Sequence, residues 1–131
     1  IEKNYKEAIK NFDNAIKIKK DFWQAINNKG LAYFELNKTN LAITSFQKAI
    51  AIEENAEPLL ALASCIRTRD INEAIFLAKK ALKKEPNYVE YVYRKEQLWG
   101  EKLQHSTEQL FKSNQLKKEI SFAKTKINLI N

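Results

Sequence analysis

A triplet of small, large and small side chains recurs along this chain, with spacings of four and then three residues. The clearest copy is Ala42, Phe46 and Ala49. The same pattern starts upstream at Ala8 and again downstream at Ala74, where an alanine takes the central position. Residues spaced by four and three share one face of a helix, so each triplet predicts a helix that packs closely on a neighbour. The copies follow one another with a period of about 34 residues, which predicts an architecture of repeated helical units.

The stretch 23–56 contains one complete unit of two helices. Its hydrophobic pattern predicts a first helix over 23–36 and a second over 40–53, joined by a short polar turn. Helices joined by so short a turn pack as antiparallel neighbours. Gly30 lies inside the first helix, where glycine costs roughly 1 kcal/mol relative to alanine. We therefore expect a neighbouring helix to approach closely at Gly30.

Incomplete copies flank this unit. Residues 1–22 supply a second helix alone, so we expect the natural protein to extend upstream with a first helix that covers its apolar face. Residues 57–88 form a unit shortened by two residues, with helices predicted over 59–67 and 71–84. The three segments together make a predicted array over residues 1–88.

The chain beyond residue 88 departs from the repeat. Residues 89–131 are predicted to form a divergent helical cap, because a solenoid needs an ending that covers the apolar face of its last unit. Asn114 is the predicted cap of a terminal amphipathic helix. The apolar stripe of that helix keeps alternating spacings of four and three, at Leu116, Ile120, Ala123, Ile127 and Ile130.

The complete unit resembles the tetratricopeptide repeat, whose signature is W-x2-L-G-x2-Y…A-x3-F…P. The matching residues are Gly30 and Tyr33 in the first helix and Ala42, Phe46 and Ala49 in the second. The positions that differ are Ile26, Lys29 and Glu54, in place of Trp, Leu and Pro. The resemblance implies an all-α fold, a right-handed superhelical solenoid of antiparallel helix pairs with a C-terminal capping segment. The C-terminal segment itself is similar to the tails of repeat proteins of cyanobacteria and plastids.

The resemblance also implies a function, which is the recognition of another protein. In this family the first helices of successive units line a concave groove, so we expect a scaffold, adaptor or assembly factor that binds a peptide or a helix there. The predicted groove consists of the side chains that point away from the Gly30 and Tyr33 stripe, with those at matching offsets in later units. These residues are Gln24, Asn27, Asn28, Leu31, Phe34, Glu35, Ala61, Leu62, Cys65, Tyr93, Arg94 and Gln97.

The mixed chemistry of this groove favours some partners over others. Family members that clamp a terminal carboxylate resemble one another in their lysine, asparagine and arginine side chains at fixed positions. Asn28 and Arg94 fit that pattern, but Glu90 stands where a lysine is needed. Leu31 and Leu62 favour an amphipathic helix, or an extended segment with an aliphatic anchor, as the partner.

The charge of the chain leaves two alternative functions open. The net charge is +7, with 20 lysines and three arginines among 23 basic residues. Arginine is the preferred residue for reading bases and clamping phosphates, so its scarcity favours solvated helix faces over a nucleic-acid surface. A helical-repeat RNA-binding protein is nevertheless one alternative, and a structural protein that self-assembles through its terminal helices is another.

No motif for catalysis, cofactor binding or metal binding stands out in the sequence. One cysteine, Cys65, and one histidine, His105, cannot supply a Cys/His metal cluster, and we expect a buried thiol and an exposed imidazole. The prediction is therefore a non-enzymatic protein without cofactor or metal. Every apolar run is far too short to form a transmembrane helix, so no transmembrane segment is predicted. The expected location is the cytoplasm, with peripheral membrane association left open.

Overall fold

The structure is a computed structural model that describes residues 2–130, with side chains described as far as residue 129. Ile1 and Asn131, at the ends of the predicted segments, and the side chain of Ile130 lie outside the described residues. Every regular element within the described residues is a helix. These helices are α1 (Glu2–Ile18), α2 (Trp23–Glu35), α3 (Thr39–Ile52), α4 (Ala56–Ile66), α5 (Ile71–Lys84), η1 (Pro86–Val89), α6 (Tyr91–Glu96), α7 (Glu101–Phe111), η2 (Asn114–Leu116) and α8 (Lys117–Ile130).

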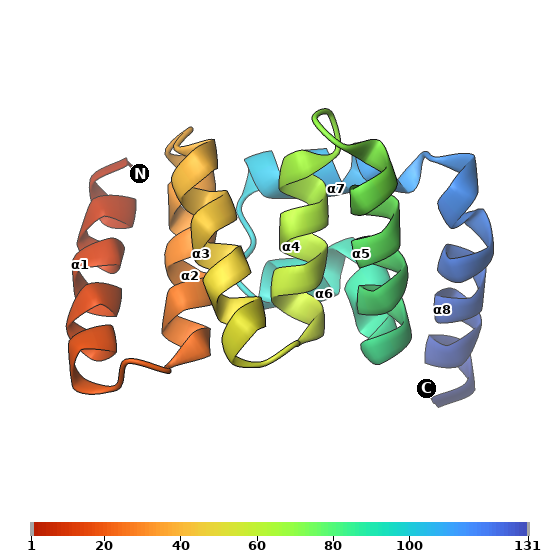
Figure 1. The fold of residues 1–131 in the computed structure, drawn as a ribbon. Coiled ribbons are helices and arrows are strands. Elements are labelled where there is room, and N and C mark those ends of the chain that lie inside the picture. Colours follow the sequence, from red (N-terminus) through yellow and green to blue (C-terminus); the bar gives the residue numbers. More distant parts are fainter. Residues whose placement is uncertain (1, 131) are drawn as a thin grey trace.

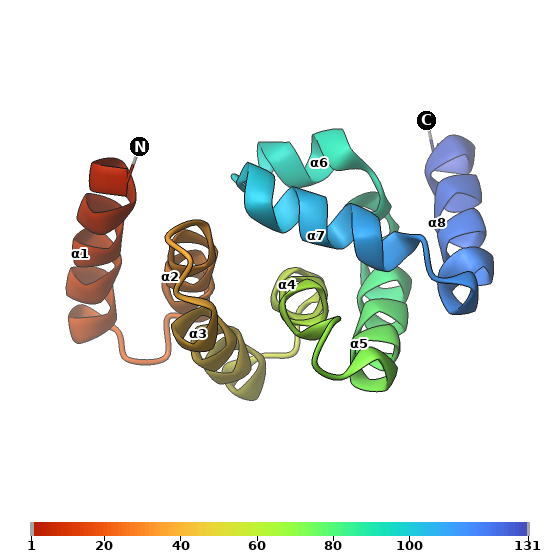
Figure 2. The ribbon, with the colours of Figure 1, turned by 90° about the horizontal axis from the view of Figure 1, so that it is seen from above.

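The helices form a row that runs from α1 at one end to α8 at the other (Figure 1). Helix α2 packs on α3, and α4 packs on α5, so each predicted unit is a pair of neighbouring helices. The pairs are joined by contacts of α3 with α4. Helices α6 and α7 leave this row and lie along one side of it (Figure 2). The predicted all-α fold of packed helix pairs, similar to tetratricopeptide repeats, is confirmed.

The observed helix limits agree closely with the sequence pattern, with two corrections. Asn114 does not cap the terminal helix, because it lies inside η2, which Ser113 caps, and α8 begins only at Lys117. Helix α4 begins at Ala56 rather than at residue 59, so Pro58 lies inside its first turn. Proline fits there because the first backbone N–H groups of a helix have no partner within it. At the start of α5, the Asp70 Oδ1 accepts a hydrogen bond of 3.1 Å from the backbone N–H of Glu73. This side-chain cap fixes the register of the second helix in the shortened unit.

Phe46 of α3 packs directly against Gly30 of α2. The Phe46 side chain is 0% exposed, and a Cβ atom added to Gly30 would lie only 2.6 Å from its Cε1. The absence of a side chain at Gly30 therefore provides the space that the edge of the ring fills. This is the close approach predicted from the glycine, and it explains why a poor helix former stands in the middle of α2.

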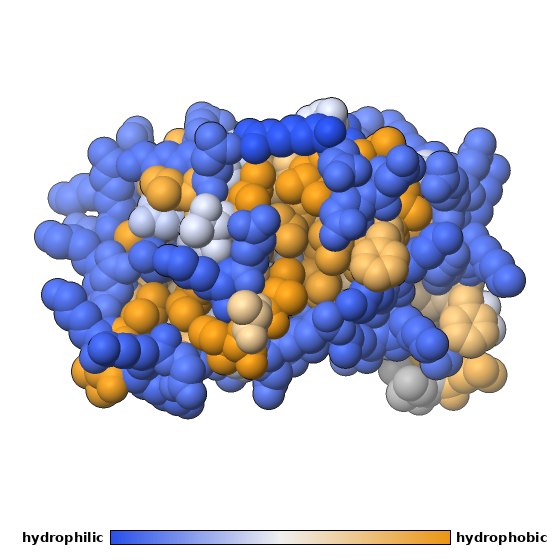
Figure 3. All heavy atoms as spheres, in the orientation of Figure 1, coloured by the Kyte–Doolittle hydropathy of each residue, from blue (hydrophilic) through white to orange (hydrophobic). Residues whose placement is uncertain are grey.

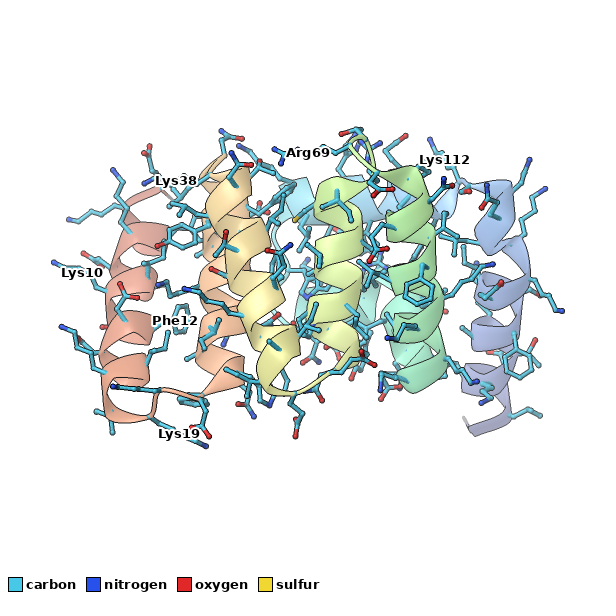
Figure 4. The ribbon with its side chains drawn as sticks, in the orientation of Figure 1. Lys10, Phe12, Lys19, Lys38, Arg69 and Lys112 are labelled. Carbon is cyan, nitrogen blue, oxygen red and sulfur yellow. The ribbon has the colours of Figure 1, made fainter. Side chains whose placement is uncertain are left out.

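The two ends of the row are covered to different extents. Helix α1 has no buried residue, and its half-buried Phe12 points toward α2 (Figure 4). An ion pair of 2.7 Å between Asp13 of α1 and Lys29 of α2 accompanies this contact. At the other end Leu116 and Ala123 are buried, and Ile120 and Ile127 pack against the core. The apolar stripe predicted for the terminal helix thus faces the array, as far as the structure describes its side chains.

We predict that Gly30→Ala destabilises the protein, although alanine is the better helix former. Helix propensity alone would add about 1 kcal/mol of stability. Pressing a Cβ against a fully buried ring costs about 1–3 kcal/mol. The free energy of unfolding, measured by urea denaturation, should therefore fall by about 1 kcal/mol. Gln24→Ala, at an exposed position of the same helix, is the control. If both variants gained the same stability, the ring would be free to move and the packing argument would fail.

Candidate functional site

The C-terminal segment lies on the face of the array that α2 and α4 form. Helix α7 crosses these two first helices on the side away from α3 and α5 (Figure 2), and it contacts both of them. Its apolar residues Leu103 and Leu110 are buried in the same core as Leu59 and Leu60 of α4. The face expected to form an open concave groove is thus largely filled by the chain itself.

Glu35, one of the predicted groove residues, holds the start of α7. Its Oε1 accepts a hydrogen bond from the backbone N–H of Lys102 and its Oε2 accepts one from Leu103, both at 3.1 Å. The N-cap residue of α7 is Gly100, whose backbone approaches the Glu35 side chain too closely for a Cβ to fit. A carboxylate at this position satisfies free N–H groups and complements the positive end of the helix dipole.

Small hydroxyl side chains allow α7 to approach α4 closely. Ser64 of α4 and Thr107 of α7 share a hydrogen bond of 2.8 Å between their hydroxyl oxygens. Ser106 donates to the backbone carbonyl of Ser64 at 2.6 Å and accepts from Arg67 Nε at 3.0 Å. Ser64 and Thr107 are fully buried, so these bonds satisfy polar groups that water cannot reach.

Arg94 connects α6 to α7 inside the protein. Its side chain is 0% exposed. Its Nε donates to Gln104 Oε1 at 2.7 Å, its Nη1 donates to the carbonyl of Tyr88 at 2.9 Å, and its Nη2 pairs with Glu108. Burial lowers the pKa of Arg94, while the neighbouring Glu108 raises it. The guanidinium of Arg94 is engaged by Gln104, Glu108 and Tyr88, so it holds α6 and α7 together. The buried side chain faces no open groove.

The twelve predicted groove residues do not form one continuous surface. Those that are buried are Asn27, Leu31, Ala61, Leu62, Cys65 and Arg94. Those that are half-buried are Asn28, Phe34, Glu35, Tyr93 and Gln97, whereas Gln24 is exposed. The repeat pattern did not predict this burial, because nothing in the spacing of the units places α7 across them. The apolar side chains of α7 are buried from water by packing against the apolar surface of α4.

Part of the face stays open as a cleft between the start of α2 and α6. It has a volume of about 520 Å³. Its lining combines three aromatic rings, three glutamates and several amide side chains, and we call it the α2–α6 cleft. The lining residues are Trp23, Gln24, Glu54, Asn55, Ala56, Glu57, Lys84, Glu85, Tyr88, Tyr93 and Gln97. Three predicted groove residues, Gln24, Tyr93 and Gln97, therefore come together here.

Aromatic rings surround a carboxyl group in this cleft. Trp99 donates a hydrogen bond of 2.8 Å from Nε1 to Glu57 Oε2. The ring of Tyr88 meets that of Tyr93 edge-on, with centroids 4.9 Å apart, and lies 5.9 Å from the ring of Trp99. Burial raises the pKa of Glu57 to about 7, and the hydrogen bond from Trp99 offsets part of this rise. Glu57 therefore changes its charge near neutral pH.

Asn27 lies beside Glu57 at the base of this region. Its side chain is 1% exposed, and neither its Nδ2 nor its Oδ1 makes a hydrogen bond within the described residues. A buried amide without partners costs about 1–3 kcal/mol. Asn27 was predicted to bind a peptide backbone, but its burial places it below the surface of the cleft.

The single cysteine and the single histidine of the chain do not line this cleft. Cys65 is buried, and burial raises the pKa of its thiol to about 12, so the thiol stays protonated at neutral pH. His105 is exposed on α7. Among residues 2–130, His, Cys, Asp and Glu side chains form no group that could hold a metal ion. None of the helices in this part of the chain is long and apolar enough to cross a membrane.

Sequence reasoning missed four residues that shape the cleft. Trp23 and Glu57 stand one repeat period apart, at the first position of successive units. Adding the first position of each unit to the predicted groove would have found both. Tyr88 and Trp99 follow the last regular unit, where the repeat no longer predicts the direction of a side chain. Their positions depend on the way η1 and α6 fold back toward α4.

The raised pKa of Glu57 predicts that stability falls as the pH rises. The pKa of Glu57 is about 7 in the folded chain against an ordinary value of 4.5, so the folded state binds the proton more tightly. The free energy of unfolding should fall by up to about 3 kcal/mol between these two pH values and level off above them. Glu57→Gln, which stays neutral, should lose this part of the pH dependence in urea denaturation.

Glu54→Gln is the matched control for that measurement. Glu54 lines the same cleft, but Lys80 and Lys84 pair with it and lower its pKa. The decline of stability toward neutral pH should therefore persist in this variant. If the stability of Glu57→Gln fell with rising pH in the same way, the ionisation of Glu57 would not be the cause of the decline. Glu57 would then have the pKa of an ordinary exposed carboxyl group, contrary to its surroundings.

Comparison with known proteins identifies the complete unit. Residues 23–56 match the family model named tetratricopeptide repeat. No match was found among curated proteins or among solved structures. The matched stretch contains α2 and α3, with Phe46, Ala42 and Ala49 fully buried at the signature positions and Gly30 against the Phe46 ring. Residues 23–56 are therefore similar, in sequence and in the packing of these residues, to one tetratricopeptide repeat.

Proposed function

We propose that this chain is a protein-interaction scaffold that binds a basic segment of another protein in the α2–α6 cleft. The observation that carries the proposal is the lining of the cleft, where three aromatic rings and three glutamates meet one lysine. Tetratricopeptide repeats form a protein-interaction fold, which supports the general role. The cleft adds the chemistry of the partner.

Aromatic faces and carboxylates together favour a cationic side chain. The π-faces of rings such as Trp23 and Tyr93 attract a lysine or arginine head group within about 6 Å. Glu57 and Glu85 provide negative charge nearby, whereas Glu54 is already paired with two lysines. The cleft is therefore locally acidic and aromatic, although the chain as a whole is basic.

The amide side chains suit the backbone of the same partner. Gln24 is exposed and Gln97 is half-buried, and both line the cleft. Each amide can donate and accept one or more hydrogen bonds, which matches the alternating donors and acceptors of an extended peptide. A lysine or arginine would then provide the anchor, and the backbone would lie along these amides.

Helix α7 supports a related use of the remaining groove. It lies on α2 and α4 with its N-terminus capped by Glu35, which is the arrangement that a partner helix would adopt on this face. Binding of an external helix to Leu31, Phe34, Ala61 or Leu62 would require α7 to move away. The α2–α6 cleft needs no such displacement, so we place the partner there.

A peptide screen tests the proposal. The labelled chain is incubated with an array of random peptides, and the peptides that bind should be enriched in lysine and arginine. For a selected peptide, Trp23→Ala and Tyr93→Ala should each raise the Kd about threefold to tenfold, because each removes a ring from the cationic side chain. Affinity should also rise from about pH 6 to pH 8 as Glu57 ionises, and Glu57→Gln should abolish that rise.

Phe122→Ala, which removes an exposed ring outside the cleft, is the control and should leave the Kd unchanged. Circular dichroism should give the same helix content for every variant, so that lost binding is not lost folding. Enrichment of acidic peptides, or a Kd unaffected by Tyr93→Ala, would refute the assignment of a basic partner to this cleft.

A further inference from the structure

A second cleft lies between α5 and α8. It has a volume of about 560 Å³ and shares no lining residue with the α2–α6 cleft. Its lining consists of Lys79, Leu82, Lys83, Lys118, Glu119, Phe122 and Lys126. Figure 3 shows separate apolar spots over α5 and over α8, with hydrophilic side chains between and around them. We call this hollow the α5–α8 cleft.

The floor and one wall of the α5–α8 cleft are apolar. Leu82 is 2% exposed and forms part of the floor, whereas the ring of Phe122 is 61% exposed on α8. The Nζ of Lys126 lies 5.1 Å from the centre of that ring. An aromatic side chain so exposed beside a hollow offers a partner apolar contact area that the chain itself leaves uncovered.

Two rows of lysine border the cleft. Lys79 and Lys83 are four residues apart on α5, and Lys118 and Lys126 lie four residues to either side of Phe122 on α8. Residues spaced by four share a helix face, and like charges at this spacing weaken a helix slightly. Four ammonium groups around one hollow would attract an anionic partner.

These lysines are largely available to a partner. The lining contains four lysines against one glutamate. Glu119 pairs with Lys79 at 3.6 Å, and the other three lysines of the cleft form no ion pair within the described residues. All four lysine side chains are exposed. The cleft is therefore positively charged around an apolar centre.

We propose that the α5–α8 cleft docks an acidic amphipathic helix of a partner protein. An apolar side chain of that helix would enter the hollow beside Phe122 and Leu82, and carboxylates on its flanks would pair with the lysine rows. A third helix can pack between α5 and α8, with its ridges of side chains in the grooves of those helices. The cleft is concave, so a flat membrane surface could meet its rims but would not fill its floor.

This partner differs from the one proposed for the α2–α6 cleft. That cleft is acidic and aromatic and suits a basic segment, whereas the α5–α8 cleft is basic and apolar. The two proposals therefore stand or fall separately. A scaffold with both clefts would bring a basic segment and an acidic helix together on one array.

Fluorescence anisotropy with a designed helix tests the docking proposal. The probe is a labelled peptide of about four helical turns, with leucines on one face and glutamates on its flanks. Lys83→Glu combined with Lys126→Glu should raise the Kd at least about tenfold, and Phe122→Ala about threefold or more. Binding should also weaken between about 0.05 and 0.2 M salt, because exposed charges are screened.

Matched controls separate local effects from total charge. Lys10→Glu combined with Lys38→Glu makes the same charge change near α1 and α3, away from α8 (Figure 4), and should leave the Kd within about twofold. Tyr93→Ala, which alters the other cleft, should also leave this Kd unchanged. A probe with lysine in place of glutamate should not bind.

Three outcomes would overturn the proposal. The first is equal loss of binding in the cleft variant and the Lys10 and Lys38 control, which would indicate a diffuse charge effect. The second is sedimentation of the chain with phosphatidylserine vesicles in a Phe122-dependent way while the acidic peptide does not bind, which would assign the surface to a membrane. The third is self-association in analytical ultracentrifugation that Phe122→Ala abolishes, which would make a second copy the occupant.

Discussion

The packing of the Phe46 ring into the space left by Gly30 sets the separation of α2 and α3. Since the ring is fully buried, it can neither move outward nor be pushed aside without opening the core. The small residues Ala42 and Ala49 lie on the same face of α3 as the ring and are also fully buried. The rest of the array follows from this spacing, because each further helix packs against a face whose position has already been fixed.

The same row of helices offers an apolar face on α2 and α4, and the chain covers much of it with α7. The packing of α7 on this face is specific, because Glu35 caps the start of α7 and the hydroxyl groups of Ser64 and Thr107 form a hydrogen bond between α4 and α7. An array that covers one of its faces with its own helix exposes less of that face than an uncovered array. The α2–α6 cleft, where the aromatic rings and carboxyl groups gather, stays accessible.

Net charge is a poor guide to the partners of this protein. The chain carries +7 overall, yet the α2–α6 cleft is acidic and the α5–α8 cleft is bordered by lysine. Screening restricts the influence of an exposed charge to about 10 Å at moderate salt, so each cleft is governed by its own lining. In the functions proposed above, the two surfaces would thus select partners of opposite charge on one small domain.

The sequence by itself determined the helices of the repeat units and their pairing, because a spacing of four and three residues permits one helical face and Gly30 permits one close neighbour. It also located Gln24, Tyr93 and Gln97, which line the open cleft. Only the tertiary structure decided that Leu62 and Arg94 are buried and that α7 covers α4. Burial depends on contacts between segments that lie far apart in the sequence, as between Ser64 and Thr107. A local period carries no information about such contacts once the repeat has ended.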